Sequence, residues 1–483
     1  MHGLMMHAPL TITSLLRHAE INHADAPIAS RQPDGSLHRY TYADAFRRAR
    51  QLAGALAARG IAPGDRIGTL AWNDFRHFEL YYGVSCSGAI AHTINPRLFA
   101  DQLEFIINDA ADRLLFVDPG ILPVIEPLAD RLDAVESIIV LADAHEMPDS
   151  PLNNLECYET FIAGQPDTFE WPDLDELTAS SLCYTSGTTG NPKGVLYSHR
   201  TTVLHALISN VADGFGFSSM DVVMPVVPMF HVNAWGMPYA APMTGAGLVF
   251  PGAGMGDGAV LSGLIAEEGV TFSAGVPTIW MAVLNHLRQS GQRLDSLNTV
   301  LIGGSACPPA LMEELREVHG VDVRHAWGMT EMSPLGTINT LKAGMAGASP
   351  EAQQAIRNNQ GRCLYGVELK IEDDDGAELP RDGSATGYLK TRGLCVCSGY
   401  YGLEESSAHA NGWFDTGDIA SIDADGYLNI TDRSKDVIKS GGEWISSIEL
   451  ENAAVGHPDI QEAAVIAVDH AKWGERPLLI VVP

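Results

Sequence analysis

The stretch Tyr184-Thr-Ser-Gly-Thr-Thr-Gly-Asn-Pro-Lys-Gly-Val195 follows residues 181–184, a short apolar run typical of a strand. Its glycines let the backbone turn tightly and expose amide N–H groups toward anionic oxygens. Hydroxyl side chains and a lysine add further donors, a set that suits the β- and γ-phosphates of a nucleotide. No Gly-Lys-Ser/Thr closes the string, so it is not a Walker loop. The expected donors are Thr185, Ser186, Gly187, Thr188, Thr189, Gly190 and Lys193.

The composition describes a globular chain with a strongly acidic surface. At 483 residues the chain is long enough for more than one domain and for a large buried core. Its formal net charge of −30 repels nucleic acid and anionic lipid, so neither is an expected partner. No apolar run approaches the roughly eighteen residues of a transmembrane helix, and no membrane span is predicted.

The cysteines favour a reducing compartment. Seven are scattered without a Cys-x-x-Cys pair, and many lie in apolar sequence. We therefore expect a cytoplasmic protein. The spacing of Cys395 and Cys397 fits one face of a buried strand better than it fits a metal site.

Apolar periodicity predicts strands that alternate with helices over most of the chain. A helix is predicted from Thr41, with apolar residues at helical spacing, and Gly60 closes it. This alternation indicates an α/β fold with largely parallel sheets. Further strands are predicted at 66–72, 114–118, 138–141, 222–227, 247–250 and 299–302, and helices at 74–88 and 309–318.

Beyond Gly366 the pattern changes to short alternating segments separated by Asp-Gly or Asn-Gly turns, which predict a small antiparallel β region. A charged joint, Asp432-Arg-Ser-Lys435, then precedes a new α/β stretch. We predict a large domain, residues 1–431, of α/β sheets with a distorted β-barrel-like region. Residues 432–483 are predicted to begin a small, mobile α/β C-terminal domain.

Six further strings follow the first one in order along the chain. They are Pro228-Met-Phe-His231-Val-Asn-Ala-Trp235, Gly303-Gly-Ser-Ala306, Ala326-Trp-Gly-Met-Thr-Glu331, Trp413-Phe-Asp-Thr-Gly-Asp418, Asp432-Arg-Ser-Lys435 and Lys439-Ser-Gly-Gly-Glu-Trp-Ile-Ser446. Together with residues 185–194, they resemble the signatures of the adenylate-forming, AMP-binding superfamily. That superfamily includes acyl-CoA synthetases, nonribosomal-peptide adenylation domains and firefly-type luciferases. The resemblance covers essentially the whole chain, and the acid segment is especially similar to that of fatty acyl-CoA ligases.

The resemblance implies an ATP site. Trp327 stands where the family usually has Tyr, and either ring can stack on adenine. The Asp418 carboxylate can accept two hydrogen bonds from ribose hydroxyls, and Thr330 is expected at the α-phosphate. Arg433 and Lys435 are expected to pair with ribose or phosphate oxygens, with a merely charged linker as the alternative. The other implied nucleotide-binding residues are Gly304, Ser305, Ala306, His325, Ala326, Gly328 and Met329.

Glu331 and Thr185 are the expected Mg²⁺ ligands, because hard cations prefer oxygen donors and neutralise charge as pyrophosphate leaves. A solvated surface glutamate is the alternative for Glu331. With Lys193 and His231, these two residues are the candidate catalytic residues. His231 is expected to position the acid against the nucleotide rather than to act as a base, because a carboxylate nucleophile is already ionised at neutral pH.

The acid and CoA sites are also implied by the resemblance. His231, Val232, Trp235 and Gly303 are expected to contact the acid. Trp235 is expected to be a gate on the acyl tunnel, with simple core packing as the alternative. The thioester loop comprises Lys439, Ser440, Gly441, Gly442, Glu443 and Trp444, whose glycines would let the backbone approach the pantetheine arm.

One family feature is not found. The family closes with a Gly-Lys whose ammonium bridges the acyl carboxylate and the α-phosphate, and no such motif follows Lys472. We expect the last part of the small domain to be absent from this sequence. Adenylation would be crippled if the physical chain ended at Pro483, whereas the thioester-forming face would partly survive.

The implied activity is that of an acid–CoA ligase, which converts a carboxylic acid, ATP and CoA to acyl-CoA, AMP and pyrophosphate through an acyl-adenylate. The expected acid is 3-methylmercaptopropionate, from dimethylsulfoniopropionate breakdown, or a short- or medium-chain fatty acid; long-chain fatty acids are the alternative. The fatty-acid members suggest a homodimer. More remote alternatives are a luciferase-like oxygenase, a carrier-loading adenylation domain, a non-catalytic nucleotide-binding scaffold, and a phosphate-loop kinase, which would release ADP.

Overall fold

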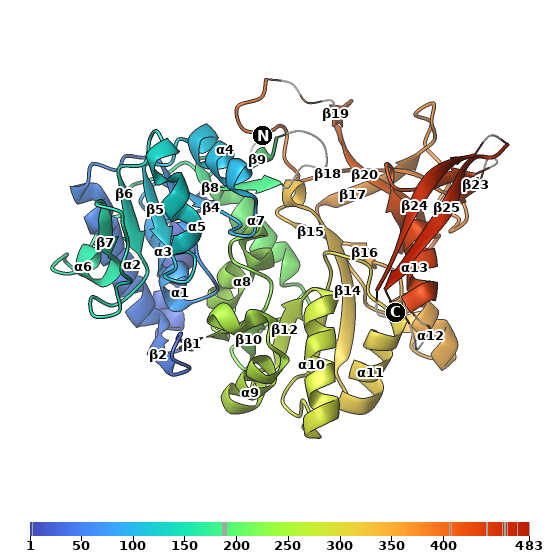
Figure 1. Cartoon of the computed structure of the whole chain (residues 1–483), viewed down its shortest axis with the longest axis horizontal. Coiled ribbons are helices and arrows are strands. Elements are labelled where there is room, and N and C mark those ends of the chain that lie inside the picture. The colour runs from blue at the N-terminus through green and yellow to red at the C-terminus, as the bar shows by residue number, and fades with distance from the viewer. Residues whose placement is uncertain are drawn as a thin grey trace.

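Two large sheets with helices on their faces form most of the molecule, and two smaller sheets lie beside them (Figure 1). This computed structural model describes residues 1, 3–185, 191–404, 406, 408–440, 443–455, 457, 460, 462–470 and 472–482. Within these residues, no helix combines the length and the apolar character needed to cross a membrane. All seven cysteines are free thiols.

The first large sheet has the strand order β7-β6-β5-β3-β4-β8-β9 and is parallel except for β9, which returns antiparallel to β8. Apolar side chains from α4 and α5 cover one face, and those from α2, α3 and α6 cover the other. The elements are β3 Arg66–Leu70, β4 Ile90–Thr93, β5 Leu114–Val117, β6 Ser137–Val140, β7 Leu155–Cys157, β8 Ala179–Thr185, β9 Lys193–Ser198, α2 Tyr42–Ala58, α3 Phe75–Cys86, α4 Ala100–Ala110, α5 Leu122–Ile125 and α6 Tyr158–Ile162.

The second large sheet has the order β16-β15-β14-β13-β12-β10-β11-β1-β2, with parallel strands in its middle and antiparallel strands at both edges. Helices α9, α10 and α11 pack on one face. The elements are β1 Pro27–Arg31, β2 Leu37–Thr41, β10 Val222–Pro225, β11 Gly247–Phe250, β12 Phe272–Gly275, β13 Thr299–Ile302, β14 Asp322–Gly328, β15 Leu335–Ile338, β16 Arg362–Cys363, α9 Gly258–Glu268, α10 Pro277–Ser290 and α11 Pro309–His319.

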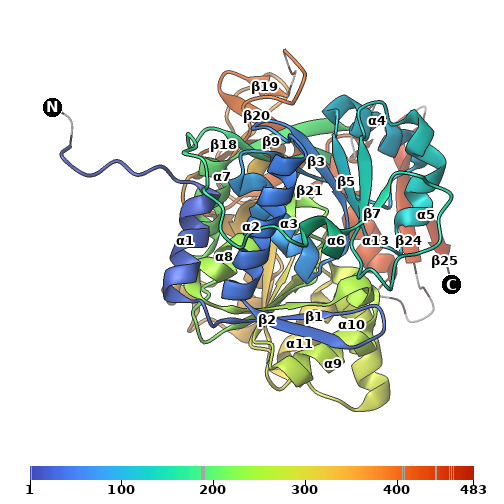
Figure 2. The ribbon, with the colours of Figure 1, turned by 90° about the vertical axis from the view of Figure 1, so that its left-hand side faces the viewer.

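A layer of helices joins the two sheets. Every residue of α3 is buried, as expected for a helix with sheets on both sides. Helices α1 (Ile12–Asn22), α7 (His199–Ser209) and α8 (Met237–Thr244) belong to the same core, and Figure 2 shows α1 and α8 on the side away from α4. The predicted alternation of strands and helices is confirmed, and several predicted bounds agree with the observed ones within two residues.

Asn73, just after β3, joins the carboxyl ends of strands from both sheets. Its side-chain amide donates to the carbonyl oxygens of Pro225 and Val227, both at 2.9 Å, and its Oδ1 accepts from the Met229 N–H at 2.6 Å. Carboxyl ends of parallel strands are where α/β folds bind ligands. The predicted phosphate loop follows β8 and the predicted acid segment follows β10, so both begin at this end of the sheets.

The third sheet is curled and antiparallel, in the order β17-β18-β20-β19 with β21 on β20, and it confirms the β region predicted after Gly366. A fourth sheet, β23-β22-β25-β24, forms the small C-terminal part with α13. The elements are α12 Pro350–Arg357, β17 Val367–Glu372, β18 Gly387–Gly393, β19 His409–Ala410, β20 Trp413–Ile422, β21 Leu428–Arg433, β22 Ile438–Ser440, β23 Glu443–Ile445, α13 Ser447–Val455, β24 Glu462–His470 and β25 Gly474–Val482.

The strand predicted around Cys395 and Cys397 is wrong. Strand β18 ends at Gly393, and both cysteines lie in the irregular segment that follows. The chain leaves the sheet there because the Cys397 N–H donates to the carbonyl oxygen of Glu331 at 2.8 Å instead of pairing with a strand. The domain boundary predicted between residues 431 and 432 falls inside β21.

Candidate active site

Strands β8 and β9 hold the two ends of the predicted phosphate loop. Thr185 and Lys193 are direct partners across this antiparallel pair, so the loop between them begins and ends at one point of the sheet. The loop residues Ser186, Gly187, Thr188, Thr189 and Gly190 lie outside the described residues.

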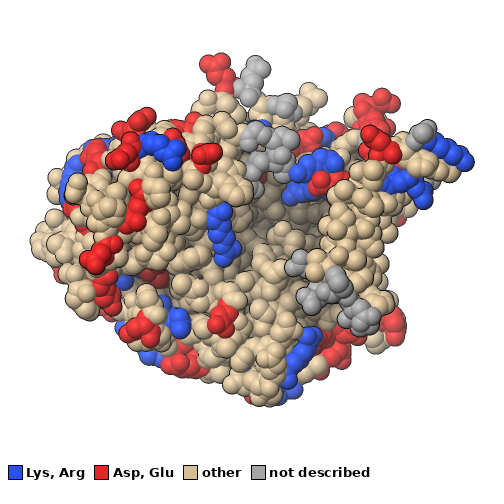
Figure 3. All heavy atoms as spheres, in the orientation of Figure 1, with Lys and Arg blue, Asp and Glu red and all other residues tan. Residues whose placement is uncertain are grey.

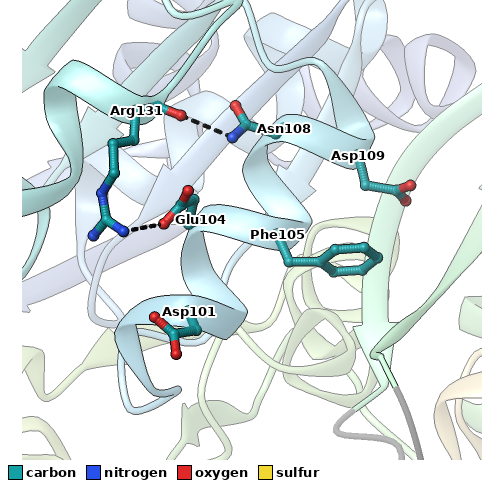
Figure 4. Close-up of a pocket in the computed structure, with 6 residues that line it drawn as sticks. All are labelled: Asp101, Glu104, Phe105, Asn108, Asp109 and Arg131. Carbon is teal, nitrogen blue, oxygen red and sulfur yellow. Dashed lines mark hydrogen bonds and ion pairs between the residues drawn. The ribbon is translucent and has the colours of Figure 1, made fainter.

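Helix α4 supports the entrance to this loop. Asp109 accepts a hydrogen bond of 2.5 Å from the Tyr184 hydroxyl, and burial together with this carboxylate raises the pKa of Tyr184. Figure 4 shows Asp109 and Phe105 pointing away from Arg131. Arg131 is itself paired with Glu104, so the open hollow on this face of α4 offers mainly acidic groups and is a poor site for phosphate.

A chain of contacts joins Lys193 to Glu331. The Lys193 ammonium lies 5.0 Å from the centre of the Tyr400 ring, and the Tyr400 hydroxyl donates to Oε1 of Glu331 at 2.8 Å. The Tyr401 N–H also donates to the carbonyl oxygen of Gly194 at 2.8 Å. The lysine at the end of the phosphate loop and the predicted metal-binding carboxylate therefore share one intermediary, Tyr400.

Thr330 and Glu331 lie in a short 3₁₀ turn after β14, and both are buried. The Tyr197 hydroxyl, from β9, donates to the carbonyl oxygen of Thr330 at 2.5 Å. Strand β9 thus holds this turn as well as the end of the phosphate loop. The structure brings Thr185, Lys193, Thr330 and Glu331 to one region through these contacts.

Trp327, Asp418 and Arg433 form a second cluster. The Trp327 indole N–H donates to Oδ2 of Asp418 at 2.9 Å, and Arg433 approaches Oδ1 at 3.1 Å. Asp418 is 3% exposed, and its burial raises the pKa of its carboxyl, although Arg433 and Trp327 oppose that shift. Asp418 and Arg433 are paired residues of β20 and β21. Lys435 is exposed.

The segment after β13 lies beside β14. A Cβ at Gly303 would lie 2.8 Å from the Ala326 carbonyl oxygen, so only glycine fits without a shift. Gly304 has φ +83°, and Gly304 and Ser305 are exposed, with Ala306 half-buried. His325 is buried against the Asn358 carbonyl oxygen, and burial lowers its pKa. The register shifts between Trp327 and Gly328, where β14 leaves its regular pairing, and Met329 follows with extended backbone.

The predicted acid segment forms a left-handed turn at Val232–Gly236. His231, just before it, is exposed to solvent, yet crowding by protein lowers its pKa and favours the neutral imidazole. Val232 and Trp235 are buried, and a Cβ at Gly303 would lie 3.1 Å from Cη2 of Trp235. The structure therefore brings the predicted acid residues Trp235 and Gly303 into contact at the end of β13.

The predicted hinge and thioester loop lie together. The buried Asp432 accepts the Ser447 N–H at 2.6 Å, and the Ser446 hydroxyl donates to the Thr431 carbonyl oxygen at 2.5 Å. The hinge therefore bonds directly to the start of α13. Lys439 and Ser440 lie in β22, and Glu443 and Trp444 lie in β23. Gly441 and Gly442 lie outside the described residues.

Sequence reasoning missed Tyr400, Tyr197 and Asn233, which tie the predicted residues to one another. Their partners are remote: Tyr400 is 69 positions from Glu331, and Tyr197 is 133 positions from Thr330. Asn233 lies within the predicted acid segment, between the apolar Val232 and Ala234, which give no polar pattern. No local spacing signals such contacts. Figure 3 shows the surface hollowed between the part built on the two large sheets and the small sheet β22–β25, with Lys and Arg side chains at its rim.

Two family models match the chain: "AMP-binding enzyme" over residues 16–401, and "AMP-binding enzyme C-terminal domain" over residues 449–483. The chain belongs to the AMP-binding enzyme family.

Known relatives of this AMP-binding enzyme include acid–CoA ligases. It is 53% identical to the 3-methylmercaptopropionyl-CoA ligase of Ruegeria pomeroyi, covering 100% of this chain and 89% of that one. It is 49% identical to the medium-chain-fatty-acid–CoA ligase of Ectopseudomonas oleovorans, covering 100% and 88%. A solved structure, the anthranilate CoA ligase AuaEII in complex with anthranoyl-AMP, superposes with a TM-score of 0.86 at 28% identity, covering 98% of this chain and 87% of that one. The predicted AMP-forming acid–CoA ligase, with ATP and CoA as substrates, is confirmed.

Proposed function

We propose that this ligase activates 3-methylmercaptopropionate or a fatty acid of short or medium chain length. The names of the relatives that are 53% and 49% identical support these two acids. The buried Trp235 supports an apolar acyl site, because its indole presents an apolar surface beside Gly303, which has no side chain. Long-chain fatty acids are the second candidate, supported by a relative of that name from Thermus thermophilus at 44% identity.

The observation that carries the proposed mechanism is the contact chain from Lys193 through Tyr400 to Glu331. An ammonium and a carboxylate that contact the same tyrosine suit a phosphate group and the divalent cation that accompanies it: the ammonium can bind phosphate oxygens and the carboxylate can bind the cation. In the first step, an oxygen of the acid attacks the α-phosphorus of ATP, the new P–O bond forms, and the bond to pyrophosphate breaks. Lys193 and the Thr185 hydroxyl hold the departing oxygens, and the Thr330 hydroxyl orients the α-phosphate.

The second cluster positions the nucleoside. The Trp327 ring stacks on adenine, and the Asp418 carboxylate accepts hydrogen bonds from the ribose hydroxyls. Each carboxylate oxygen has two lone pairs, so Asp418 can hold Arg433 and Trp327 and still accept from ribose. His231 orients the acid, and its lowered pKa favours an imidazole that places no positive charge beside it.

Mg²⁺ fits the donors of this site. Glu331 offers a carboxylate that is buried and held by Tyr400, and Thr185 offers a hydroxyl at the end of β8. Oxygen donors of this kind are the ligands that Mg²⁺ prefers. When bound, the ion would neutralise charge on the leaving pyrophosphate.

The second step makes the thioester. The CoA thiolate attacks the acyl carbonyl carbon, the C–S bond forms, and the bond from that carbon to the AMP oxygen breaks, so that AMP leaves. The paired strands β22 and β23 carry Lys439, Ser440, Glu443 and Trp444 of the predicted thioester loop. They admit the pantetheine arm after the small domain turns about Asp432. We also propose a homodimer, by analogy with fatty-acid members, and a cytoplasmic location, which the seven free thiols support.

The test is a pyrophosphate-release assay with the purified full-length protein, ATP and Mg²⁺, with and without CoA, over 3-methylmercaptopropionate and saturated acids from four to sixteen carbons. We expect AMP, pyrophosphate and the acyl-CoA, with the highest kcat/KM for 3-methylmercaptopropionate or an acid of medium length. ADP as the product would favour a phosphate-loop kinase. ATP binding with no acyl-AMP from any acid would overturn the proposed function.

A further inference from the structure

The turn that carries Trp235 has an unusual backbone. Val232, Asn233, Ala234 and Trp235 have φ values of 43°, 51°, 48° and 54°, and Gly236 follows at 78°. Left-handed conformations are unfavourable for residues with a Cβ, and Asn tolerates them better than the other three non-glycine residues here. Such a run persists only when its surroundings hold it in place.

The Asn233 side chain provides that hold. Its Nδ2 donates to the Ser181 hydroxyl at 3.0 Å, and its Oδ1 faces the hydroxyls of Tyr81 and Thr93, each at 3.4 Å, and the Cys183 thiol at 3.6 Å. Asn233 is 6% exposed, so these partners replace water almost completely. The amide therefore connects the turn to α3 and to strands β4 and β8 of the seven-stranded sheet.

Trp235, two residues on, faces the other sheet. Its Cη2 would lie 3.1 Å from a Cβ at Gly303, at the end of β13 in the nine-stranded sheet. The end of the turn is fixed as well, because a Cβ at Gly236 would lie 2.7 Å from Nδ1 of the buried His205. The turn thus spans the two sheets, with Asn233 anchored on one side and the indole placed on the other.

We propose that Asn233 is a positioning residue that determines which acids are accepted, because its amide holds the left-handed turn and so the position of the Trp235 indole. This inference rests on the proposed function, in which Trp235 lines the acid site. An indole released from its position can move away from β13 and leave space for a longer chain. Loss of the amide therefore shifts preference toward longer acids, without a direct contact between Asn233 and substrate.

The experiment compares Asn233→Gly with Asn233→Ala. Both variants remove the amide, but glycine keeps the freedom to adopt positive φ and alanine does not. We expect both to raise the ratio of kcat/KM for decanoate to that for 3-methylmercaptopropionate by about tenfold, the range that a methylene or two is worth in a closed apolar pocket. We expect the change to appear in KM for the acid, whereas KM for ATP stays within about twofold of the wild-type value. If Asn233→Ala shifts the ratio of kcat/KM values and Asn233→Gly keeps the wild-type ratio, the effect comes from the backbone conformation, and the proposed role of the amide is overturned.

One control variant separates a positioning role from a general loss of stability, and one further variant replaces the Asn233 variants if they do not fold. Asn339→Ala removes another buried amide, which donates to the carbonyl oxygens of Ile356 and Asn359, and we expect a loss of stability with an unchanged acid ratio. An equal ratio shift in that variant would overturn the inference. If the Asn233 variants fail to fold, Ser181→Ala removes the acceptor of Nδ2 and is expected to shift the ratio in the same direction; an unchanged ratio there would count against the proposal.

A double-mutant cycle tests whether Asn233 acts through Trp235. In a Trp235→Ala background, Asn233→Gly is expected to change the acid ratio no further, because the group it positions is gone. Additive effects would overturn the proposed route. If the full-length wild-type protein forms no acyl-CoA from any acid, the proposed function itself fails. If wild type discriminates between acids and the Asn233 variants discriminate equally, only the present inference fails.

Discussion

The Trp327 indole N–H donates a hydrogen bond of 2.9 Å to Oδ2 of Asp418, although the two residues lie 91 positions apart. Both residues are buried, and Arg433 holds the other carboxylate oxygen. The ring proposed to stack on adenine and the acid proposed to hold ribose are therefore fixed relative to each other before nucleotide arrives. Such preorganisation reduces the loss of side-chain conformational entropy that accompanies ATP binding.

Substitution of Asp418 is expected to weaken ATP binding specifically. Asp418→Asn replaces a charged acceptor by a neutral amide, and hydrogen bonds to charged groups contribute about 1.5–3 kcal/mol, so KM for ATP should rise by roughly 10–150-fold. Trp327→Phe keeps an aromatic face but removes the N–H donor, so its effect should be smaller. Initial rates of pyrophosphate release at varied ATP measure both. The exposed Asp382 provides the control Asp382→Asn, and a wild-type KM for ATP in Asp418→Asn would contradict the assignment.

Substitutions of Glu331 and Tyr400 should weaken Mg²⁺ binding to different extents. Glu331→Gln keeps the shape and can still accept from the Tyr400 hydroxyl, but it loses the charge that a divalent cation needs. We expect the Mg²⁺ concentration for half-maximal rate to rise at least about tenfold, because loss even of a group that only holds a metal ligand weakens metal binding by that much or more. Tyr400→Phe keeps the ring beside Lys193 and should cause a smaller rise. Titrations with Mg²⁺ at saturating ATP decide this, and unchanged curves in Glu331→Gln would exclude it as a ligand.

Much of the fold follows from local patterns. Strands such as β11 and β13 have their predicted bounds, because short apolar runs between turn residues leave few alternatives. The phosphate loop and the Thr330–Glu331 string were also recognised as candidate site residues. The left-handed turn at Val232–Gly236 could not be predicted, since its sequence is apolar and its conformation depends on partners in three other elements. The same holds for Tyr400, whose position depends on the segment where the Cys395–Cys397 strand prediction failed.

Gly303 is expected to tolerate no side chain. In Gly303→Ala the new methyl group would lie 2.8 Å from the Ala326 carbonyl oxygen and 3.1 Å from the Trp235 ring, so either β14 or the indole must shift. Overpacking of this kind costs about 1–3 kcal/mol of the free energy of unfolding. We also expect kcat/KM to fall for every acid, because Gly303 lies between Trp235 of the proposed acid site and Ala326 of the proposed nucleotide site. Gly263→Ala on α9 is the matched control: nothing lies within 4 Å of its Cβ, and a helical alanine should stabilise by about 0.5–1 kcal/mol. Urea denaturation and initial rates test both, and a Gly303→Ala variant as stable and active as wild type would contradict the packing.

His205 should make stability depend on pH in a defined direction. Burial lowers the pKa of His205 from 6.5 to about 3, while its Nε2 accepts from the Leu335 N–H at 3.1 Å. As pH falls below 6.5 the unfolded chain binds a proton that the folded chain does not, so this residue makes the folded state progressively less stable. Between pH 7.5 and 4.5 the wild type should therefore lose about 3 kcal/mol relative to His205→Gln, which cannot titrate.

Urea denaturation of wild type and His205→Gln at both pH values measures this difference. Buried carboxyl groups titrate in both proteins, so their contributions to the pH dependence of stability cancel in the comparison. Asp74, for example, has its pKa raised to about 7 by burial and acts with the opposite sign in both proteins. Leu207→Gln, at an exposed position of the same helix, introduces the same side chain without removing a titratable group, so its effect should not vary with pH. A His205→Gln difference that stays constant from pH 7.5 to 4.5 would show that the imidazole titrates alike in the folded and unfolded states, against its buried position between Gly236 and Leu335.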